Sequence, residues 1–146
     1  MKTVENLLEK AILKIPKEKV ALLFSGGVDS LALAFYLKKL NYDFTCYTVG
    51  VKDSKDIEAA KKLASELKLK HEVRIIPKKE IPSYLAKVVP ILRNTSPIDV
   101  SVGLTTYLAS LLAKEKIVIS GLGADEIFGG YSRHKDSKDL NTDLKK

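Results

Sequence analysis

Residues 22–37 read LLFSGGVDSLALAFYL, and this stretch decides the fold. An apolar run leads into two glycines flanked by serines and an aspartate, and a run rich in Ala and Leu follows at once. This order is typical of a strand that turns tightly into a helix. A tight turn needs neither two hydroxyls nor a carboxylate for its own geometry, so these side chains indicate a ligand site.

Strand and helix patterns alternate on both sides of this turn. The predicted strands are residues 20–24, 42–49, 71–76 and 117–119, and the predicted helices are residues 7–15, 29–40, 56–67 and 100–114. Between residues 77 and 97, Pro82, Pro90 and Pro97 interrupt the helical pattern, which predicts broken helices. The alternation favours the α/β class, with an open parallel sheet whose ligands bind at the carboxyl ends of its strands.

The composition allows one domain and excludes several kinds of site. The chain has 146 residues, of which 45% are hydrophobic, and this is enough for one packed core. Cys46 is the single cysteine, so the chain has no disulfide framework and no multi-cysteine metal site, and we expect a buried structural thiol. The first residues lack the apolar core of a signal peptide, and no stretch reaches membrane-spanning length. We therefore expect a soluble, cytoplasmic protein without a membrane partner.

The formal charge of +7 favours polyanionic partners such as nucleotides or RNA. Lys and Arg residues are scattered among acidic residues along the chain rather than gathered in one block. The charge therefore identifies no partner by itself, and nucleic acid is not excluded.

The turn at residues 25–30, SGGVDS, has the chemistry of an anion site. The first N–H groups of a helix have no backbone partner, and the helix dipole is positive there. Gly26 and Gly27 carry no Cβ, so phosphate oxygens can approach the backbone, while the hydroxyls of Ser25 and Ser30 can donate further hydrogen bonds. Asp29 would repel a phosphate unless a cation lay between them, so it is either a Mg²⁺ ligand or a cap of the helix. From the residues alone, the turn is a phosphate site or a plain turn between strand and helix.

A second glycine-rich segment, residues 120–131 with the sequence SGLGADEIFGGY, follows the fourth predicted strand. Taken alone, this segment is typical of a flexible loop that ends in a helix cap at Asp125. Both glycine-rich segments follow predicted strands, and the carboxyl ends of parallel strands meet at one edge of a sheet. The sequence therefore predicts that the two segments lie at the same site.

Together, the two segments resemble the signatures of the PP-loop ATP pyrophosphatases, which cleave ATP between the α and β phosphates. SGGVDS resembles the PP-loop, and the second segment resembles a signature of the synthetase domain of asparagine synthetases and β-lactam synthetases. The resemblance extends over nearly the whole chain, including YTVG at residues 47–50. It implies a Rossmann-like parallel sheet of the adenine nucleotide α-hydrolase type, with helices on both faces and strand order 3-2-1-4. We expect one such domain at residues 1–134 and a polar tail at residues 135–146.

The resemblance also implies a set of contacts with ATP and Mg²⁺. Backbone groups of Leu23, Val49 and Gly121 would contact the adenosine. The β and γ phosphates would be held by the PP-loop, at Ser25, Gly26, Gly27, Asp29 and Ser30. Asp125 would join Asp29 at Mg²⁺, because two carboxylates converge on one polyphosphate only with a metal ion between them. The paired aspartates are the central structural prediction.

The sequence departs from the family's pattern at three points. Leu122 stands where asparagine synthetases carry an acidic or related polar residue that assists amine attack, and a leucine cannot accept a proton. Neither the family's helical portion with its catalytic lysine nor a glutaminase domain is recognisable in the sequence. We therefore expect a second copy or a partner subunit to supply the missing residues or ammonia, and we assign no catalytic residue.

Three functions are consistent with the sequence. The leading one is an AMP-forming, ATP-dependent ligase that cleaves Mg-ATP to AMP and pyrophosphate, adenylates an unknown acceptor and serves amide transfer. The second is a PP-loop enzyme that modifies tRNA, which suits the basic charge. The third is an ATP-binding module without chemistry, which suits Leu122.

Overall fold

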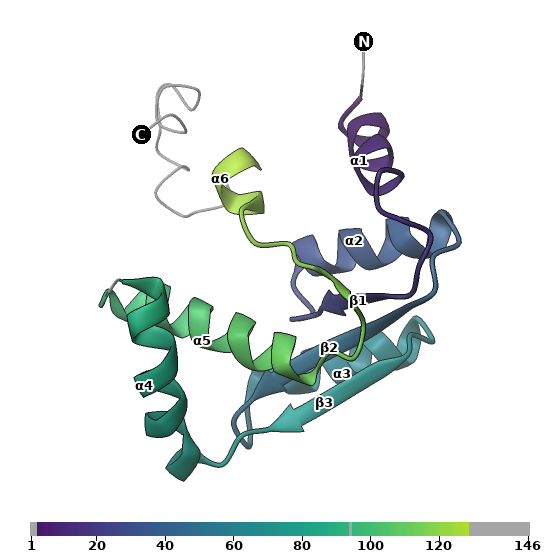
Figure 1. Ribbon diagram of the computed structural model, residues 1–146. Helices are drawn as coiled ribbons and strands as arrows, with labels where there is room; N and C mark the ends of the chain where they lie inside the picture. The colour runs from purple at the N-terminus through teal and green to yellow at the C-terminus, as the bar shows by residue number, and fades with distance from the viewer. Residues whose placement is uncertain (1–2, 94, 129–146) are drawn as a thin grey trace, which may run out of the picture.

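The computed structural model describes residues 3–93 and 95–128 (Figure 1). Along these residues lie α1 (Val4–Ile12), β1 (Val20–Leu23), α2 (Val28–Lys39), β2 (Phe44–Gly50), α3 (Lys55–Glu66), β3 (His71–Ile75), η1 (Lys78–Glu80), α4 (Ile81–Leu92), α5 (Pro97–Leu112), β4 (Ile117–Ile119) and α6 (Ala124–Phe128). The predicted domain end at residue 134 and the predicted tail at residues 135–146 lie outside the described residues. Within the described ranges, no helix is both long enough and apolar enough to span a membrane.

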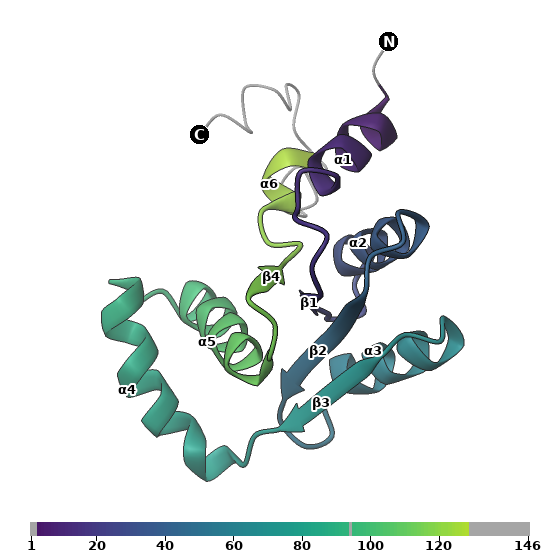
Figure 2. The same cartoon turned by 45° about the vertical axis from the view of Figure 1, so that its right-hand side comes forward.

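The four strands form one parallel sheet in the order β3-β2-β1-β4, which confirms the predicted order (Figure 2). β1 lies in the interior of the sheet, where it pairs with Phe44–Tyr47 of β2 on one side and with Ile117–Ile119 of β4 on the other. Because all the strands are parallel, their carboxyl ends lie at one edge. This geometry brings the loop after β1 and the loop after β4 to the same end of the sheet.

Helices cover both faces of the sheet (Figures 1 and 2). On one face, α1, α2 and α3 pack on buried residues of β1 and β2 that include Leu22 and Cys46. On the other face, Leu108 of α5 packs near Val49, and α4 packs against α5. Burial on both faces explains why β1 is a continuous apolar run and why β2 is buried along nearly its whole length. Burial also raises the pKa of the Cys46 thiol to about 12, so this thiol stays protonated, as a structural cysteine does.

The segment between β3 and α5 shows that the prediction of broken helices is wrong. After the short turn η1, α4 runs without a break from Ile81 to Leu92. Pro82 lies in the first turn, where a missing N–H costs no helical bond, and Pro90 lies in the last turn. Pro97 begins α5 for the same reason as Pro82. The prolines therefore lie near helix ends, and the remaining predicted elements are present with ends shifted by up to three residues.

Candidate functional site

The carboxyl ends of β1, β2 and β4 and one side of α5 surround a cavity of about 610 Å³. This volume is in the range of pockets that bind small ligands. Most of the predicted site residues line it: Leu23, Ser25, Asp29, Ser30, Val49, Gly121 and Asp125. Gly26 and Gly27 do not line the cavity. The structure thus brings residues of both glycine-rich segments to one cavity.

The SGGVDS turn is braced by its own hydroxyls. Gly27 is the N-cap of α2, and its N–H donates to Oγ of Ser25 at 3.2 Å. The Ser30 hydroxyl donates to the Gly27 carbonyl at 3.0 Å, and the two serine hydroxyls lie 3.3 Å apart. Ser30 is buried, whereas Ser25 is exposed at the cavity wall. The two serines therefore shape the turn, and the exposed Ser25 hydroxyl is the one more accessible to a ligand.

Gly26 has a packing role that sequence reasoning did not find. Its φ of +77° is in the left-handed region, and a Cβ at this position would lie 3.0 Å from the backbone N of Ala60 in α3. Any side chain here would push the turn away from α3. The sequence pattern assigns the glycine to phosphate approach, whereas the contact that requires it in the structure is with a helix far along the chain.

The two glycine-rich segments touch at Gly121 and Asp29. A Cβ on Gly121 would lie only 2.9 Å from Cβ of Asp29, so the chain that leaves β4 passes directly against the first turn of α2. Asp29 lies in that first turn and is not the cap, because the N-cap is Gly27. Asp125 is likewise the second residue of α6 rather than a residue that precedes the helix. The helix-cap alternatives for both aspartates are therefore wrong.

Asp29 and Asp125 have the properties of carboxylates that lack a protein counterion. Both line the cavity, and within the described residues neither makes an ion pair or a side-chain hydrogen bond. The described part of the chain also has no group of three or more His, Cys, Asp or Glu residues that could hold a metal alone. Mg²⁺ is commonly bound by one or two carboxylates together with water and substrate phosphates. The donor set fits a magnesium–polyphosphate complex better than a metal site built from protein alone.

Other walls of the cavity were not predicted. Ser101, Thr105 and Thr106 of α5 line one side, and Ser54 and Asp56, at the start of α3, line another. The Ser101 and Thr105 positions are four residues apart, so they share one face of the helix, and the Thr105 hydroxyl donates to the Ser101 carbonyl at 2.9 Å. Hydroxyl residues at helical spacing within an otherwise apolar helix were the signal that could have identified this wall.

Leu122 also lines the cavity, and 66% of its surface is exposed. Its side chain is therefore not needed for the core. An apolar residue at this place gives the cavity no proton acceptor between Gly121 and Gly123.

Comparison with known proteins assigns the family. The family model described as asparagine synthase matches residues 3–145. The chain belongs to the asparagine synthase family. A putative glutamine-hydrolysing asparagine synthetase from Methanocaldococcus jannaschii is 38% identical over 137 residues, which is 90% of this chain and 25% of the relative. The chain thus spans about a quarter of the length of the curated asparagine synthetases that it matches.

Solved structures support the same fold for this asparagine-synthase-like chain. NMN synthetase from Francisella tularensis matches with a TM-score of 0.57 and 18% identity, over 88% of this chain and 56% of that one. NH3-dependent NAD synthetase from Campylobacter jejuni matches with a TM-score of 0.53 and 20% identity, over 87% of this chain and 57% of that one. These likenesses confirm an α/β fold with a parallel sheet like that of the NAD and NMN synthetases. The chain is therefore an asparagine-synthase-like domain.

Proposed function

We propose that this domain binds Mg-ATP in the cavity and cleaves it to AMP and pyrophosphate while it adenylates an acceptor for amide transfer. The observation that carries the proposal is the contact between Gly121 and Asp29. This contact joins the two signature segments, and both Asp29 and Asp125, which make no ion pair within the described residues, line the same cavity.

The cavity walls suggest how ATP would lie. Backbone groups at Leu23, Val49 and Gly121 would hold the adenosine at the ends of three strands. The phosphates would then extend toward the SGGVDS turn, where the positive end of α2 favours negative charge. Asp29 and Asp125 would hold Mg²⁺, which when bound would neutralise the charge of the departing pyrophosphate.

The proposed reaction transfers the adenylyl group of ATP to a carboxylate of the acceptor. A carboxylate oxygen of the acceptor forms a bond to the α phosphorus, and the bond between that phosphorus and the oxygen bridging to the β phosphate breaks. Pyrophosphate leaves with the electron pair, and the acceptor becomes an acyl adenylate. An amine then displaces AMP. The described residues contribute binding and orientation, and we assign them no proton transfer.

The test follows radiolabelled Mg-ATP during incubation with the purified chain, with and without aspartate and ammonia. We expect AMP and pyrophosphate in equal amounts, and we expect Asp29→Asn and Asp125→Asn to abolish them. Asp56→Asn is the matched control, because Asp56 also lies in a first helical turn on the cavity wall. Formation of ADP instead of AMP would refute the proposal.

A second candidate is a module that binds Mg-ATP without cleaving it. Leu122 favours it, because this exposed residue gives the cavity wall no group that could assist an amine. This candidate predicts bound ATP that stays unchanged. For the ligase, we expect a second copy or a partner subunit to supply a catalytic lysine or ammonia. If light scattering showed that the chain is a monomer and this monomer turned over ATP, no partner would be required.

The tRNA-modifying alternative is tested with the same protein. The expected result is weak tRNA binding that disappears at moderate salt without sequence preference, because the charge of +7 attracts any polyanion. Salt-resistant binding of one tRNA would favour this alternative over the ligase.

A further inference from the structure

The residue just before the SGGVDS turn is tied to two neighbouring strands by side chains. Phe24 follows the last residue of β1, and its carbonyl accepts a hydrogen bond from the Thr48 hydroxyl of β2. Oγ1 of Thr48 in turn lies 2.7 Å from Nε2 of His71, the first residue of β3. A chain of two hydrogen bonds thus crosses the sheet from β3 to the end of β1.

The direction of each bond follows from the number of hydrogens. Thr48 has one hydroxyl hydrogen, and it is engaged with the Phe24 carbonyl. Oγ1 must therefore accept from Nε2–H of His71, which defines the tautomer of the ring. Burial lowers the pKa of His71, and the charge of Lys61 acts in the same direction, so the ring is neutral at pH 7 and carries its hydrogen on Nε2.

The surroundings leave these groups little freedom. Thr48 is 5% exposed and Phe24 is 2% exposed. The rings of Phe24 and His71 pack edge to face, with centroids 5.9 Å apart. The backbone N–H of Phe24 also donates to the Tyr47 carbonyl at 2.9 Å. Both polar groups of Phe24 are therefore held by β2, immediately before the first residue of the turn.

We propose that Thr48 and His71 are positioning residues that hold the SGGVDS turn in the shape that binds the phosphates of ATP. The proposal rests on the proposed function for its ligand. His71 acts through Thr48, and Thr48 acts through the Phe24 carbonyl, which sets the direction in which the chain leaves β1. Small displacements of a binding group can cost on the order of a hundredfold in an enzyme's efficiency, so the position of this carbonyl matters.

The first experiment compares Thr48→Val with Thr48→Ser by calorimetric titration of the full chain with Mg-ATP. Valine keeps the shape but leaves the Phe24 carbonyl and His71 Nε2–H without their partner, whereas serine keeps the hydroxyl. We expect Thr48→Val to weaken binding at least about tenfold and Thr48→Ser to restore it to within about threefold. Thr45→Val is the matched control, because Thr45 is equally buried at 5% but lies three residues earlier, on the opposite face of the same strand.

A second pair of variants keeps the proposal testable if Thr48→Val fails to fold. His71→Gln retains an N–H donor, and His71→Phe retains the ring against Phe24 but has no donor. We expect only His71→Phe to weaken Mg-ATP binding. Equal effects of the two His71 variants, or a loss in Thr45→Val as large as in Thr48→Val, would overturn the proposal.

Amide hydrogen exchange tests the positioning role of Thr48 independently of ATP binding. If the wild-type chain binds no Mg-ATP, the proposed function fails, but the amides of residues 25–30 still report the shape of the turn. We expect these amides to exchange faster in Thr48→Val than in wild type, with no change in Thr45→Val. Unchanged exchange in Thr48→Val would overturn the positioning role whether or not ATP binds.

Discussion

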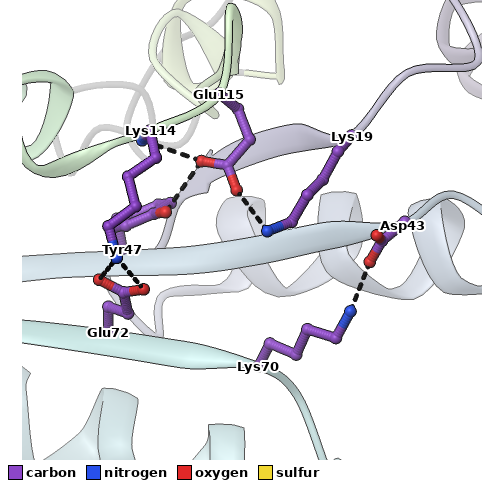
Figure 3. A network of polar contacts seen from close by, with 7 residues as sticks. All are labelled: Lys19, Asp43, Tyr47, Lys70, Glu72, Lys114 and Glu115. Carbon is purple, nitrogen blue, oxygen red and sulfur yellow. Dashed lines mark hydrogen bonds and ion pairs between the residues drawn. The ribbon is translucent and has the colours of Figure 1, made fainter.

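The acidic side chains at the two ends of the sheet differ in whether they are paired with lysines. At the carboxyl end, Asp29 and Asp125 line a cavity and make no ion pair within the described residues. At the amino end, acidic side chains are paired with lysines (Figure 3). The ligand proposed for the carboxyl end brings its own cation, whereas the ion pairs at the amino end lie within the protein itself.

Glu115 is the centre of the amino-end network. Its side chain is only 3% exposed, and its two oxygens lie 3.1 Å from Nζ of Lys19 and 2.8 Å from the hydroxyl of Tyr47, which donates to it (Figure 3). Burial alone would raise the pKa of this carboxyl, but the hydrogen bond from Tyr47 and the ion pair with Lys19 outweigh it and hold the pKa below its usual value. The network joins the segments that precede β1 and β4 to the middle of β2.

Tyr47 links the two ends, because it binds Glu115 and also lines the cavity. The difference between the ends is therefore local to the charged groups and does not reflect separate parts of the molecule. The comparison shows that one sheet can pair its acidic side chains with lysines at one end and leave two aspartates at the other end accessible from a cavity. Variants at the two ends should accordingly separate stability from binding.

The largest expected effect is the loss of stability in Glu115→Ala. We expect a loss of about 3 kcal/mol, at the upper end of the cost of leaving a buried donor unpaired, because the Tyr47 hydroxyl loses its acceptor, whereas the Lys19 side chain is 50% exposed and can be solvated. Glu72→Ala is the control: Glu72 pairs with Lys114 at 2.9 Å, but its side chain is 40% exposed, so the loss should be at most about 1 kcal/mol. Urea unfolding measures both, and equal losses would contradict the contrast between buried and exposed pairs.

The second effect concerns the carboxyl end, where Asp29→Asn should weaken Mg-ATP binding about a hundredfold, or roughly 2.7 kcal/mol. Stability should change by less than about 1 kcal/mol, because Asp29 loses only its favourable place near the positive end of α2. Calorimetric titration and thermal unfolding test the two halves of this prediction. Unfolding of Asp29→Asn at a much lower temperature would show that Asp29 serves stability, as Glu115 does.

The third effect distinguishes two glycines that share a positive φ. Gly26→Ala should destabilise the protein by about 2 kcal/mol or more, because left-handed strain adds to a clash with the backbone of Ala60. Gly123→Ala should cost only the strain of about 1 kcal/mol, since nothing lies within 4 Å of the added Cβ. Urea unfolding of the pair provides the comparison, and a Gly123 variant as unstable as the Gly26 variant would refute the packing role of Gly26.

The smallest effect is a pH dependence that differs between Glu115 and His71. Because burial lowers the pKa of His71, the unfolded chain binds this proton more readily than the folded protein. The stability due to His71 is complete above pH 6.5 and declines as the pH falls from there through the lowered pKa. In His71→Gln, the unfolding temperature should therefore change less between pH 7 and pH 5 than in the wild type.

Glu115 acts in a more acidic window. Since its folded pKa is lowered, its contribution is complete above pH 4.5 and is lost as the pH falls through the folded value. Glu115→Gln should therefore not alter how the unfolding temperature changes between pH 7 and pH 5. If His71→Gln also left this dependence unaltered, another group would be responsible for the titration in that range.

Sequence patterns predicted the parts of the molecule that depend on neighbours along the chain. The strand before SGGVDS and the helix after it follow from local periodicity, and the resemblance added the strand order. Most predicted site residues line one cavity because the strands that carry them are parallel. Their contacts with ATP and Mg²⁺ stay predictions.

The remaining features depend on contacts between distant segments. The requirement for Gly26 arises from Ala60, and the role of His71 arises from Thr48 and Phe24. No periodicity within one segment can show such contacts. The prediction of broken helices failed for a related reason. The effect of a proline depends on where the helix begins and ends, and the positions of the prolines in the sequence do not show this.

The pairing of β4 with β1 has a consequence for how the protein folds. β4 is three residues long, and its partner β1 lies near the other end of the described chain. Contacts between residues so far apart in sequence form slowly, because a long loop must close first. During synthesis, the SGGVDS turn would leave the ribosome long before Gly121 could reach Asp29. Binding of the nucleotide would therefore report that the last strand has joined the sheet.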